Sequence, residues 1–252
     1  AKGGRVNSKV EALVRAAGDK LRAGYSHYGA HQEKERYHLV TDLDGEMDDH
    51  LCTGLQELYP TEGIYSEESC ELTSVSGDRW VIDPIDGTAY LIFGIPFFSI
   101  SVARQSDGQV VEAHVFNPVS NEYFFADTQA GGSTLNGNRI QVSRTTEVCD
   151  SLLAFGFSVN PDQIQRYTRE WGTVTRRMKK GLPQICPALS ICNVARGRID
   201  GYIDFGCSFE GQAAASLILE NAGGSMRDYN DRDYFPETKG GVFTNGRLKI
   251  DH

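Results

Sequence analysis

Two aspartates that could share a cation stand close together in the stretch WVIDPIDGTAY, residues 80 to 90. Carboxylates as near as Asp83 and Asp86 repel each other, so we expect a positive group between them. Proline fixes its own φ and keeps the preceding residue extended, which predicts a buried strand that ends at Asp83 and a turn after it. This turn can bring both carboxylates and the Ile85 carbonyl oxygen to one point, and hard oxygen ligands of this kind suit Mg²⁺.

The next two residues, Gly87 and Thr88, are predicted to begin a short helix. Backbone N–H groups at a helix start bind phosphate oxygens. A phosphate site would then adjoin the metal site, as metal-assisted phosphoryl transfer requires. The competing interpretation is an Asx-type turn at the end of a strand, and these residues alone do not decide between the two.

Two further acidic segments favour the metal site. GIYSEES, residues 63 to 69, places Glu67 at the end of a short predicted strand, and the ends of adjacent strands often meet. LVTDLDGE, residues 39 to 46, places Asp42 and Asp44 where a helix begins. The competing interpretations are a solvated face and, for Asp42 in particular, an N-cap.

The composition sets the class of protein. A chain of 252 residues with 40% hydrophobic and 23% charged residues fits one large globular domain or two small, closely packed ones. The net charge of −9 argues against a nucleic-acid partner. No apolar run approaches the roughly 20 residues that cross a bilayer, and AKGGRVNSKV at the start lacks the apolar core of a signal peptide. We therefore expect no membrane partner.

The cysteines and histidines give no sign of a soft-metal site. The six cysteines form no C-x-x-C pair, and the six histidines show no H-E-x-x-H spacing. Buried, reduced thiols in a cytoplasmic protein are the favoured interpretation. Oxygen-ligand metal sites remain open.

Hydrophobic periodicity predicts that the order of helices and strands changes near residue 145. The first part contains helices and then mainly antiparallel strands, predicted at 6–28 and 44–58 (helices) and at 63–66, 79–83, 97–103, 110–116, 122–126 and 141–143 (strands). The second part alternates strands at 151–155, 200–204 and 240–245 with helices at 161–180, 188–197 and 212–224. We therefore expect two tightly packed units, 1–145 with the metal and phosphate motif and 146–252 as an α/β unit on the substrate side.

Five segments together resemble a known family: LVT-x-x-D, EES, WVIDPIDGT, LNGNRIQVS and ENAGG, in this order and at these distances. They resemble the inositol monophosphatase family, a lithium-sensitive, magnesium-dependent group that includes fructose-1,6-bisphosphatase and the phosphoadenosine-phosphate phosphatases. The resemblance covers nearly the whole chain, to Gly224. It implies an α/β (α+β) fold, the layered αβαβα sandwich of the sugar-phosphatase type. It also implies in-line attack of a metal-activated water on a small phosphomonoester, without a covalent intermediate.

The resemblance implies roles for four metal-binding residues. Glu67 matches a glutamate that binds metal and helps orient the attacking water. Asp83 would bridge two metals, the Ile85 carbonyl would bind one of them, and Asp86 would bind the other.

It also implies roles around the phosphate and the substrate. Gly87 and Thr88 would hold the phosphate through backbone N–H groups, and the Thr88 hydroxyl would help to activate water. Asp44 matches an acid that supports Thr88. Asp204, in DGYIDFG, falls where the family has an acidic residue that touches substrate hydroxyls.

The chain departs from the family at its second motif, W-D-x-A-A. The aspartate of that motif is a metal ligand and touches substrate, but here it aligns with Gly211 in CSFEGQAAASLILENAGG. Glu210, one residue earlier, could replace it and reach the metal or the substrate. Alternatively the metal site is crippled, or position 211 has been altered in this chain.

Other departures lie on the substrate side. The family's G-[ST]-A is replaced by Ile185-Cys186-Pro187, the residues after Asp-Gly-Thr are Ala89 and Tyr90, and a family threonine is Leu43. The metal and phosphate part of the pattern is thus kept, while the substrate part is rewritten.

We therefore expect an Mg²⁺-dependent hydrolase of a small phosphomonoester, such as a cyclitol, sugar or related phosphate, that acts in the cytoplasm as a homodimer. The alternative is a divergent homologue with lost or altered chemistry, acting as a small-molecule or anion binder or a non-hydrolytic enzyme. A regulatory partner that acts by dimerisation is a third possibility. Fold alone does not decide among them.

Overall fold

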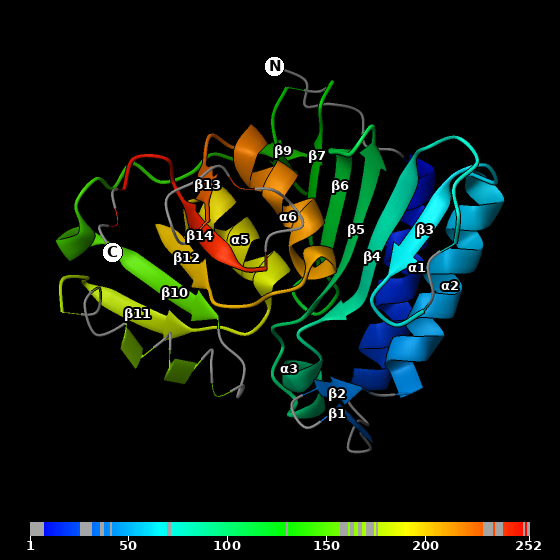
Figure 1. Ribbon diagram of the computed structural model, residues 1–252, viewed down its shortest axis with the longest axis horizontal. Coiled ribbons are helices and arrows are strands. Elements are labelled where there is room, and N and C mark those ends of the chain that lie inside the picture. Colours follow the sequence, from blue (N-terminus) through cyan, green and yellow to red (C-terminus); the bar gives the residue numbers. More distant parts are fainter. Residues whose placement is uncertain are drawn as a thin grey trace.

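The computed structural model shows two large β-sheets with helices packed around and between them (Figure 1). The structure describes residues 8–25, 32–35, 38–40, 42–69, 72–129, 131–156, 161, 164–165, 168–169, 174, 176–228, 234, 239–248 and 250. The larger sheet has seven strands and the smaller has five.

The seven-stranded sheet follows chain order almost without crossovers. Its strands are β3 (Gly63–Ser66), β4 (Arg79–Asp86), β5 (Ser99–Ser106), β6 (Gln109–Asn117), β7 (Glu122–Asp127), β8 (Thr134–Leu135) and β9 (Asn138–Arg139). β3 pairs parallel with β4, and every later pairing in this sheet is antiparallel. The mainly antiparallel sheet expected for the first part of the chain is confirmed.

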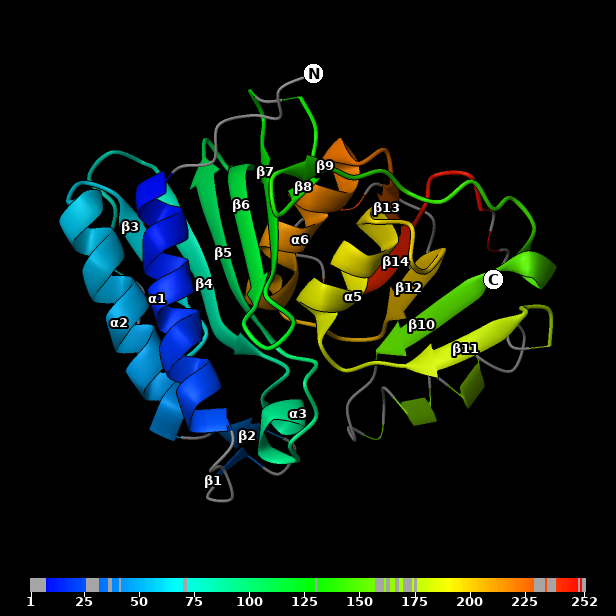
Figure 2. The same cartoon turned by 180° about the vertical axis from the view of Figure 1, so that it is seen from behind.

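Two long helices, α1 (Ser8–Tyr25) and α2 (Asp42–Leu58), cover one face of this sheet (Figure 2). Val10, Val14 and Leu21 recur at helical spacing on the buried face of α1, and α2 contributes Met47 and Leu51. These side chains form one hydrophobic core with the near face of the sheet. α2 thereby holds its first turn, which contains Asp44, against the end of β4.

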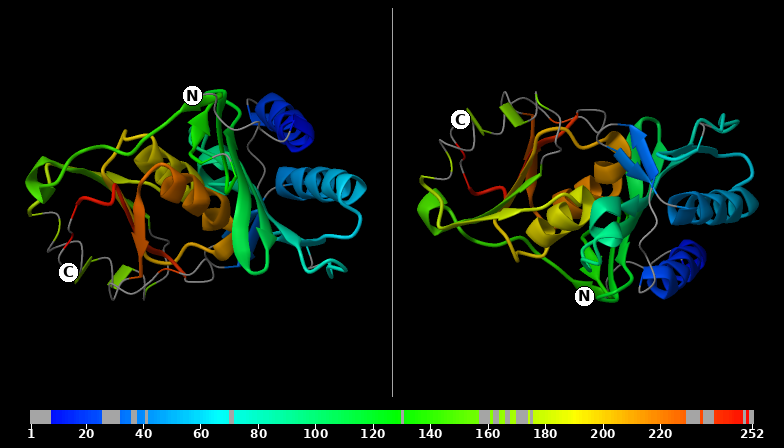
Figure 3. Two further views of the ribbon diagram at one scale, coloured as in Figure 1. Left: turned by 90° about the horizontal axis from the view of Figure 1, so that it is seen from above. Right: turned by 90° about the horizontal axis from the view of Figure 1, so that it is seen from below.

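The opposite face of the large sheet packs against α5 (Pro187–Ala195) and α6 (Phe209–Asn221). Beyond them lies the second sheet, in the order β11 (Lys180–Pro183), β10 (Leu152–Gly156), β12 (Gly201–Asp204), β14 (Gly241–Thr244) and β13 (Ser225–Arg227). Helical residues described between 161 and 174 lie on its outer face (Figure 3). The expected α/β class and layered αβαβα arrangement are therefore confirmed.

The remaining elements are short. They comprise α3 (Thr88–Ile92), a 3₁₀ turn (Val148–Asp150) and a two-stranded sheet of β1 (Gln32–Glu35) and β2 (His38–Val40). None of the described helices combines the length and the apolar character that a membrane span needs.

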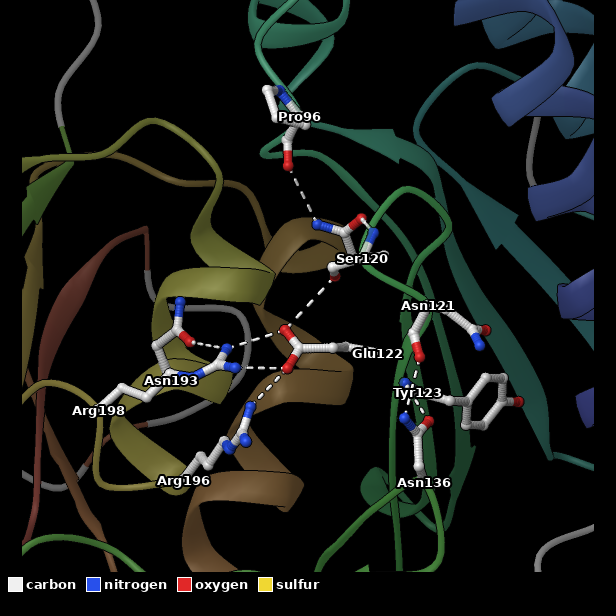
Figure 4. A network of polar contacts seen from close by, with 10 residues as sticks. Pro96, Ser120, Asn121, Glu122, Tyr123, Asn136, Asn193, Arg196 and Arg198 are labelled. Carbon is white, nitrogen blue, oxygen red and sulfur yellow. Dashed lines mark hydrogen bonds and ion pairs between the residues drawn. The ribbon is translucent and has the colours of Figure 1, made fainter.

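A charged cluster joins the two parts of the chain where α5 ends (Figure 4). Glu122 at the start of β7 accepts hydrogen bonds from Arg196 and Arg198, with 2.9 Å between Arg198 Nη1 and Glu122 Oε2. Arg198 also donates to Asn193 Oδ1 at 3.0 Å. Because the arginines follow α5 in the chain, this cluster fixes the end of α5 against the start of β7 in the large sheet.

Several predicted boundaries were wrong. β4 continues through a bulge to Asp86 instead of ending at Asp83, and α2 begins at Asp42 instead of 44. Residues 141–143 form no strand, since Val142 bonds to the Ala222 carbonyl beyond α6. The helix predicted over 161–180 stops before β11 begins at Lys180, and residues 26–28 of the first predicted helix lie outside the described residues.

Two helical glycines offer a matched test of this packing. A Cβ on Gly18 would lie 2.3 Å from Phe116 Cε1 in the core, whereas a Cβ on Gly45 would have no atom within 4 Å. We expect Gly18→Ala to lower the free energy of unfolding by about 1–3 kcal/mol through overpacking. Gly45→Ala should raise it by up to about 1 kcal/mol through helix propensity. Denaturant titration measures both, and equal effects would contradict the packing of α1 on β6.

Candidate active site

The parallel pairing of β3 and β4 brings Glu67 to Asp83. Ser66 lies opposite Ile82, and the Glu67 N–H donates to the Ile82 carbonyl oxygen at 3.1 Å. The two strands therefore end side by side, and the Glu67 and Asp83 carboxyls share a hydrogen bond. The sequence-based expectation that these strand ends meet is confirmed.

A β-bulge turns Asp83 and Asp86 toward the same space. Asp83 lies opposite Ser101 and Asp86 opposite Ser99, so β4 holds one more residue than β5 between these pairs. Asp83 Oδ1 accepts the Ile85 N–H at 3.1 Å, which is the Asx turn that the sequence left as the competing interpretation. The turn and the carboxylate cluster coexist, because one Asp83 oxygen shapes the turn and the other remains available.

Gly87 is required at the start of α3. Its φ is +90°, and a Cβ there would lie 3.0 Å from the Cys186 Cβ and 3.2 Å from the Phe97 carbonyl oxygen. Only glycine adopts this conformation readily and leaves room for these neighbours. The helix Thr88–Ile92 then begins beside the aspartates, as predicted.

The Thr88 hydroxyl connects three elements. It lies 2.9 Å from the Ile85 carbonyl oxygen and 3.1 Å from Asp44 Oδ1, and either can accept its proton. Asp44 is buried in the first turn of α2, at 1% exposure. The pairing of Asp44 with Thr88 that the resemblance implied is thus present in the geometry.

Asp86 is anchored by the start of α5. Asp86 Oδ2 accepts the Ala188 N–H at 2.7 Å and the Cys186 thiol at 2.9 Å. The other oxygen, Oδ1, is left to face the position of Gly211. No sequence signal predicted these two partners, because they lie about a hundred positions further along the chain.

Gly211 lies where a further carboxylate would join the cluster. It is the third residue of α6, and its N–H donates to the Ser208 N-cap oxygen at 3.3 Å. A Cβ at Gly211 would stand 3.4 Å from Asp83 Oδ2 and 3.7 Å from Asp86 Oδ1, which is ordinary contact distance. The glycine therefore leaves open a place that a longer side chain could fill.

Glu210 is close to this cluster but on a different side of it. The residue is buried, its backbone carbonyl accepts the Ser101 hydroxyl at 3.4 Å, and its charge acts on Glu67. Among the described residues that line the cavity, Glu210 is absent. It thus neighbours Glu67 instead of occupying the space beside Gly211.

Asp204 is fully engaged in internal hydrogen bonds. Its Oδ1 accepts the N–H groups of Gly206 and Cys207 at 2.8 and 2.6 Å, and its Oδ2 accepts the Tyr202 hydroxyl. The side chain is buried and lies outside the described lining of the cavity. This geometry gives Asp204 a structural role at the end of β12 and does not favour the substrate contact that the resemblance implied.

The acidic groups face a cavity of about 270 Å³. Its described lining consists of Glu67, Asp83, Ile85, Asp86, Gly87, Thr88, Ala89, Ile185, Pro187, Gly206, Cys207, Ser208 and Gly211. No lysine, arginine or histidine is among these residues. The carboxylates are therefore not neutralised by cationic side chains of the described lining.

Burial and mutual repulsion alter the ionisation of the cluster. Burial raises the pKa of Asp86 to about 8, against the hydrogen bonds from Cys186 and Ala188 that lower it. Burial raises the pKa of Asp83 well above its ordinary range, and the charges of Glu67 and Asp86 raise it further. The site therefore holds protons near neutral pH when no cation is bound.

Burial also raises the pKa of Glu67 to about 7, with the charge of Glu210 as the next cause. The Glu67 residue as a whole is exposed to solvent, whereas its carboxyl contacts Asp83. Water at this edge of the cluster screens part of the repulsion. The repulsion therefore acts most strongly between the buried carboxyls of Asp83 and Asp86.

The chemistry of this donor set fits a hard divalent cation. Three carboxyls and the Ile85 carbonyl surround one cavity, and oxygen ligands of this kind bind Mg²⁺. In the described part of the chain, no group of three His, Cys, Asp or Glu side chains is spaced so that it could hold a metal ion as it stands. Glu67 and Asp83 share a hydrogen bond instead, and a cation would take the place of that proton.

The prediction that the thiols are buried is confirmed for some of the described cysteines and not for others. Cys186, Cys192 and Cys207 are buried and free, as expected. Cys149 is exposed and Cys52 is half-buried, so the prediction of buried thiols was wrong for these two.

The comparisons with known proteins agree with this geometry. Residues 5–251 match the inositol monophosphatase family. The Nus factor SuhB of Pseudomonas aeruginosa is 32% identical over 211 residues, which cover 81% of this chain and 78% of that protein. The Nus factor SuhB of Pasteurella multocida is 31% identical over 228 residues, which cover 86% of this chain and 82% of that protein.

Solved structures are similar over nearly the whole chain. The crystal structure of the extragenic suppressor protein SuhB from Bartonella henselae is 27% identical, covers 96% of this chain and 94% of that one, and superposes with a TM-score of 0.91. An IMPase of Thermotoga maritima is 26% identical and superposes with a TM-score of 0.85. The match covers 94% of this chain and 90% of that one. By sequence and by fold, this chain belongs to the inositol monophosphatase family.

Proposed function

We propose that this protein hydrolyses a small phosphomonoester in a reaction that depends on a divalent cation, in the first place Mg²⁺. The observation that carries the proposal is the convergence of Glu67, Asp83 and Asp86 on one cavity whose described lining has no cationic side chain. Holding such a cluster in the fold is costly unless a positive charge joins it. Membership in the family supports the same chemistry.

Glu67, Asp83, Asp86 and the Ile85 carbonyl would hold the cation. When bound, such an ion neutralises phosphate charge and makes water a stronger nucleophile. Asp83 can serve it only through Oδ2, because Oδ1 shapes the turn, and Asp86 through Oδ1, because Oδ2 is anchored. One oxygen of each aspartate would thus serve the cation, and the cation would replace the proton that Asp83 shares with Glu67.

Gly87 and Thr88 would receive the phosphate. The first N–H groups of a helix have no intrahelical acceptor, and the Gly87 N-cap supplies no side-chain cap. Asp44 can accept the Thr88 proton, which leaves the hydroxyl oxygen free to accept one from water. Glu67, at the exposed edge of the cluster, is placed to orient that water.

A second candidate function is a binding role without hydrolysis. Two observations favour it: Gly211 supplies no carboxylate, and relatives of at least 30% identity carry the name Nus factor SuhB. The protein would then bind a small anion or a partner molecule through the same fold. Glu210 restores the missing charge only if it rotates toward the cavity.

We further infer a cytoplasmic homodimer with a small phosphorylated substrate and no nucleic-acid or membrane partner. The free thiols support a reducing compartment, and the net charge of −9 disfavours nucleic acid. Exposed Phe93 and Leu182 offer apolar surface for a subunit contact.

Phosphate release decides between the two functions. Sugar, cyclitol and nucleotide phosphates would be incubated with the protein in Mg²⁺ and, separately, in EDTA. Release that requires Mg²⁺ supports the hydrolase. Absence of turnover on the whole panel, together with no Mg²⁺ binding by calorimetry, would favour the binding role.

Replacement of Asp86 tests the cation site. In Asp86→Asn the amide oxygen can keep the bonds from Ala188 and Cys186, so the fold should survive while an NH₂ group replaces the metal-facing oxygen. We expect kcat/KM to fall by at least roughly 100-fold. The control is Asp107→Asn, in an exposed turn with φ of +50° that asparagine tolerates. An active Asp86→Asn enzyme would contradict the assignment.

Replacement of Gly211 tests whether the site lacks one ligand. Gly211→Asp places a carboxylate beside Asp83 Oδ2 and Asp86 Oδ1 without a clash. We expect a lower Tm in EDTA from the added repulsion, and Mg²⁺ affinity raised by roughly tenfold. Gly45→Asp, at an exposed helical glycine, is the control. Unchanged Mg²⁺ affinity in calorimetry would mean that position 211 does not face the cation.

The pKa shifts predict how stability depends on pH. The pKa of Asp86 is about 8 in the fold, against 3.8 ordinarily, so between these values the folded state keeps a proton that the unfolded chain has lost. Without a cation, the free energy of unfolding should therefore fall as pH rises from about 4 to about 8. Because Mg²⁺ binds ionised carboxylates, it should raise Tm more at about pH 8 than at about pH 5. A Tm gain independent of pH would count against these ligands.

A further inference from the structure

The wall of the cavity that faces away from the carboxylates is largely apolar. Apart from the carboxylates, the described lining includes Ala89, Ile185, Pro187, Gly206 and Cys207. Ile185 is 38% exposed, so it stands at the mouth, where the alcohol part of a phosphomonoester would lie. The Ile185 N–H donates to the Tyr90 hydroxyl at 3.3 Å, which ties this segment to α3.

Three polar side chains near this wall, Asp204, Cys207 and Cys186, are already committed to the protein. Both oxygens of Asp204 accept internal donors, from Tyr202 and from the backbone after β12. The Cys207 thiol donates to Gln212 Oε1 at 3.0 Å, and the Cys186 thiol donates to Asp86. Each of these groups would have to break a buried hydrogen bond to reach a ligand.

Few hydroxyl or amide side chains remain to receive a polar substrate. Beyond the carboxylates, Thr88 and Ser208 are the hydroxyl groups of the described lining. Thr88 is directed to Ile85 and Asp44, and the Ser208 oxygen accepts the Gly211 N–H. A ring that carries several hydroxyls would lose water on entering and find few side-chain partners in the described lining.

We infer that the substrate of the proposed hydrolase presents an apolar carbon skeleton next to its ester oxygen, such as an alkyl or aryl group, in place of a polyhydroxylated ring. This inference rests on the proposed function, in which a water oxygen bonds to phosphorus, the ester P–O bond breaks, and the alcohol leaves with a proton. Ile185 and Pro187 determine the specificity by packing against that alcohol. A ring hydroxyl buried there without a partner would weaken binding of the substrate.

The test compares cyclohexyl phosphate with myo-inositol 1-phosphate, which has the same ring with hydroxyl groups. With Mg²⁺ present, we expect kcat/KM for cyclohexyl phosphate to be higher by roughly 10- to 100-fold, since apolar pockets reject added hydroxyls only to this degree. Ile185→Ser should reduce the ratio several-fold. Ile164→Ser, at 40% exposure on the outer helix, is the matched control and should leave the ratio unchanged.

The outcomes separate this inference from the proposed function. Hydrolysis of both esters with inositol 1-phosphate equal or preferred would overturn the apolar-substrate inference and leave the hydrolase intact. A ratio that Ile185→Ser does not change would show that this wall does not set the preference. If neither ester is hydrolysed, the hydrolase proposal fails, and calorimetry of both esters with the protein in Mg²⁺ still decides whether the cavity prefers the apolar ring.

Discussion

The repulsion between two buried aspartates, with Glu67 at the exposed edge beside them, is the constraint on which this structure depends. Asp83 and Asp86 are 3% and 4% exposed, and Glu67 contacts Asp83. No side chain of opposite charge belongs to the described lining of their cavity. The fold must therefore hold the groups in place by other means, and a proton or a cation must offset the charge.

The holding groups come from distant parts of the chain. Parallel pairing with β3 supplies Glu67, the bulge of β4 presents both aspartates, and the backbone at the start of α5 fixes Asp86. α2 supplies Asp44 for Thr88. The cavity thus lies where the large sheet meets the helices of the second part of the chain, and its geometry depends on the packing of both. The charged cluster at Glu122 strengthens that packing from the far end of α5.

Gly211 distinguishes this member of the family, because it supplies no carboxylate to the acidic cluster. The space above Asp83 Oδ2 and Asp86 Oδ1 is open, while Glu210 faces Glu67 from the neighbouring position of α6. The site consequently keeps its acidic floor and helix start but has one fewer carboxylate and an apolar mouth at Ile185. The proposed cation ligands are thus present together, while the polar side chains near Ile185 are engaged within the protein. The acidic cluster supports the proposal of phosphate chemistry. The apolar residue at the mouth argues against a cyclitol as the substrate.

The sequence by itself determined the parts of this protein that depend on local pattern. The apolar run before Asp83, the Asp-Pro-Ile-Asp-Gly-Thr turn and the helical periodicity of α1 and α2 predicted these elements and the meeting of Glu67 with Asp83. The resemblance of five segments to a known family predicted the layered fold. Only the tertiary structure decided which atoms are free. Cys186 and Ala188 occupy one oxygen of Asp86, and Tyr202 and two backbone N–H groups satisfy Asp204. The bonds to Asp204 come from residues two or three positions away, at the end of β12. The bonds to Asp86 join residues about a hundred positions apart and carry no periodic signal, because they arise from the packing of α5 against the large sheet.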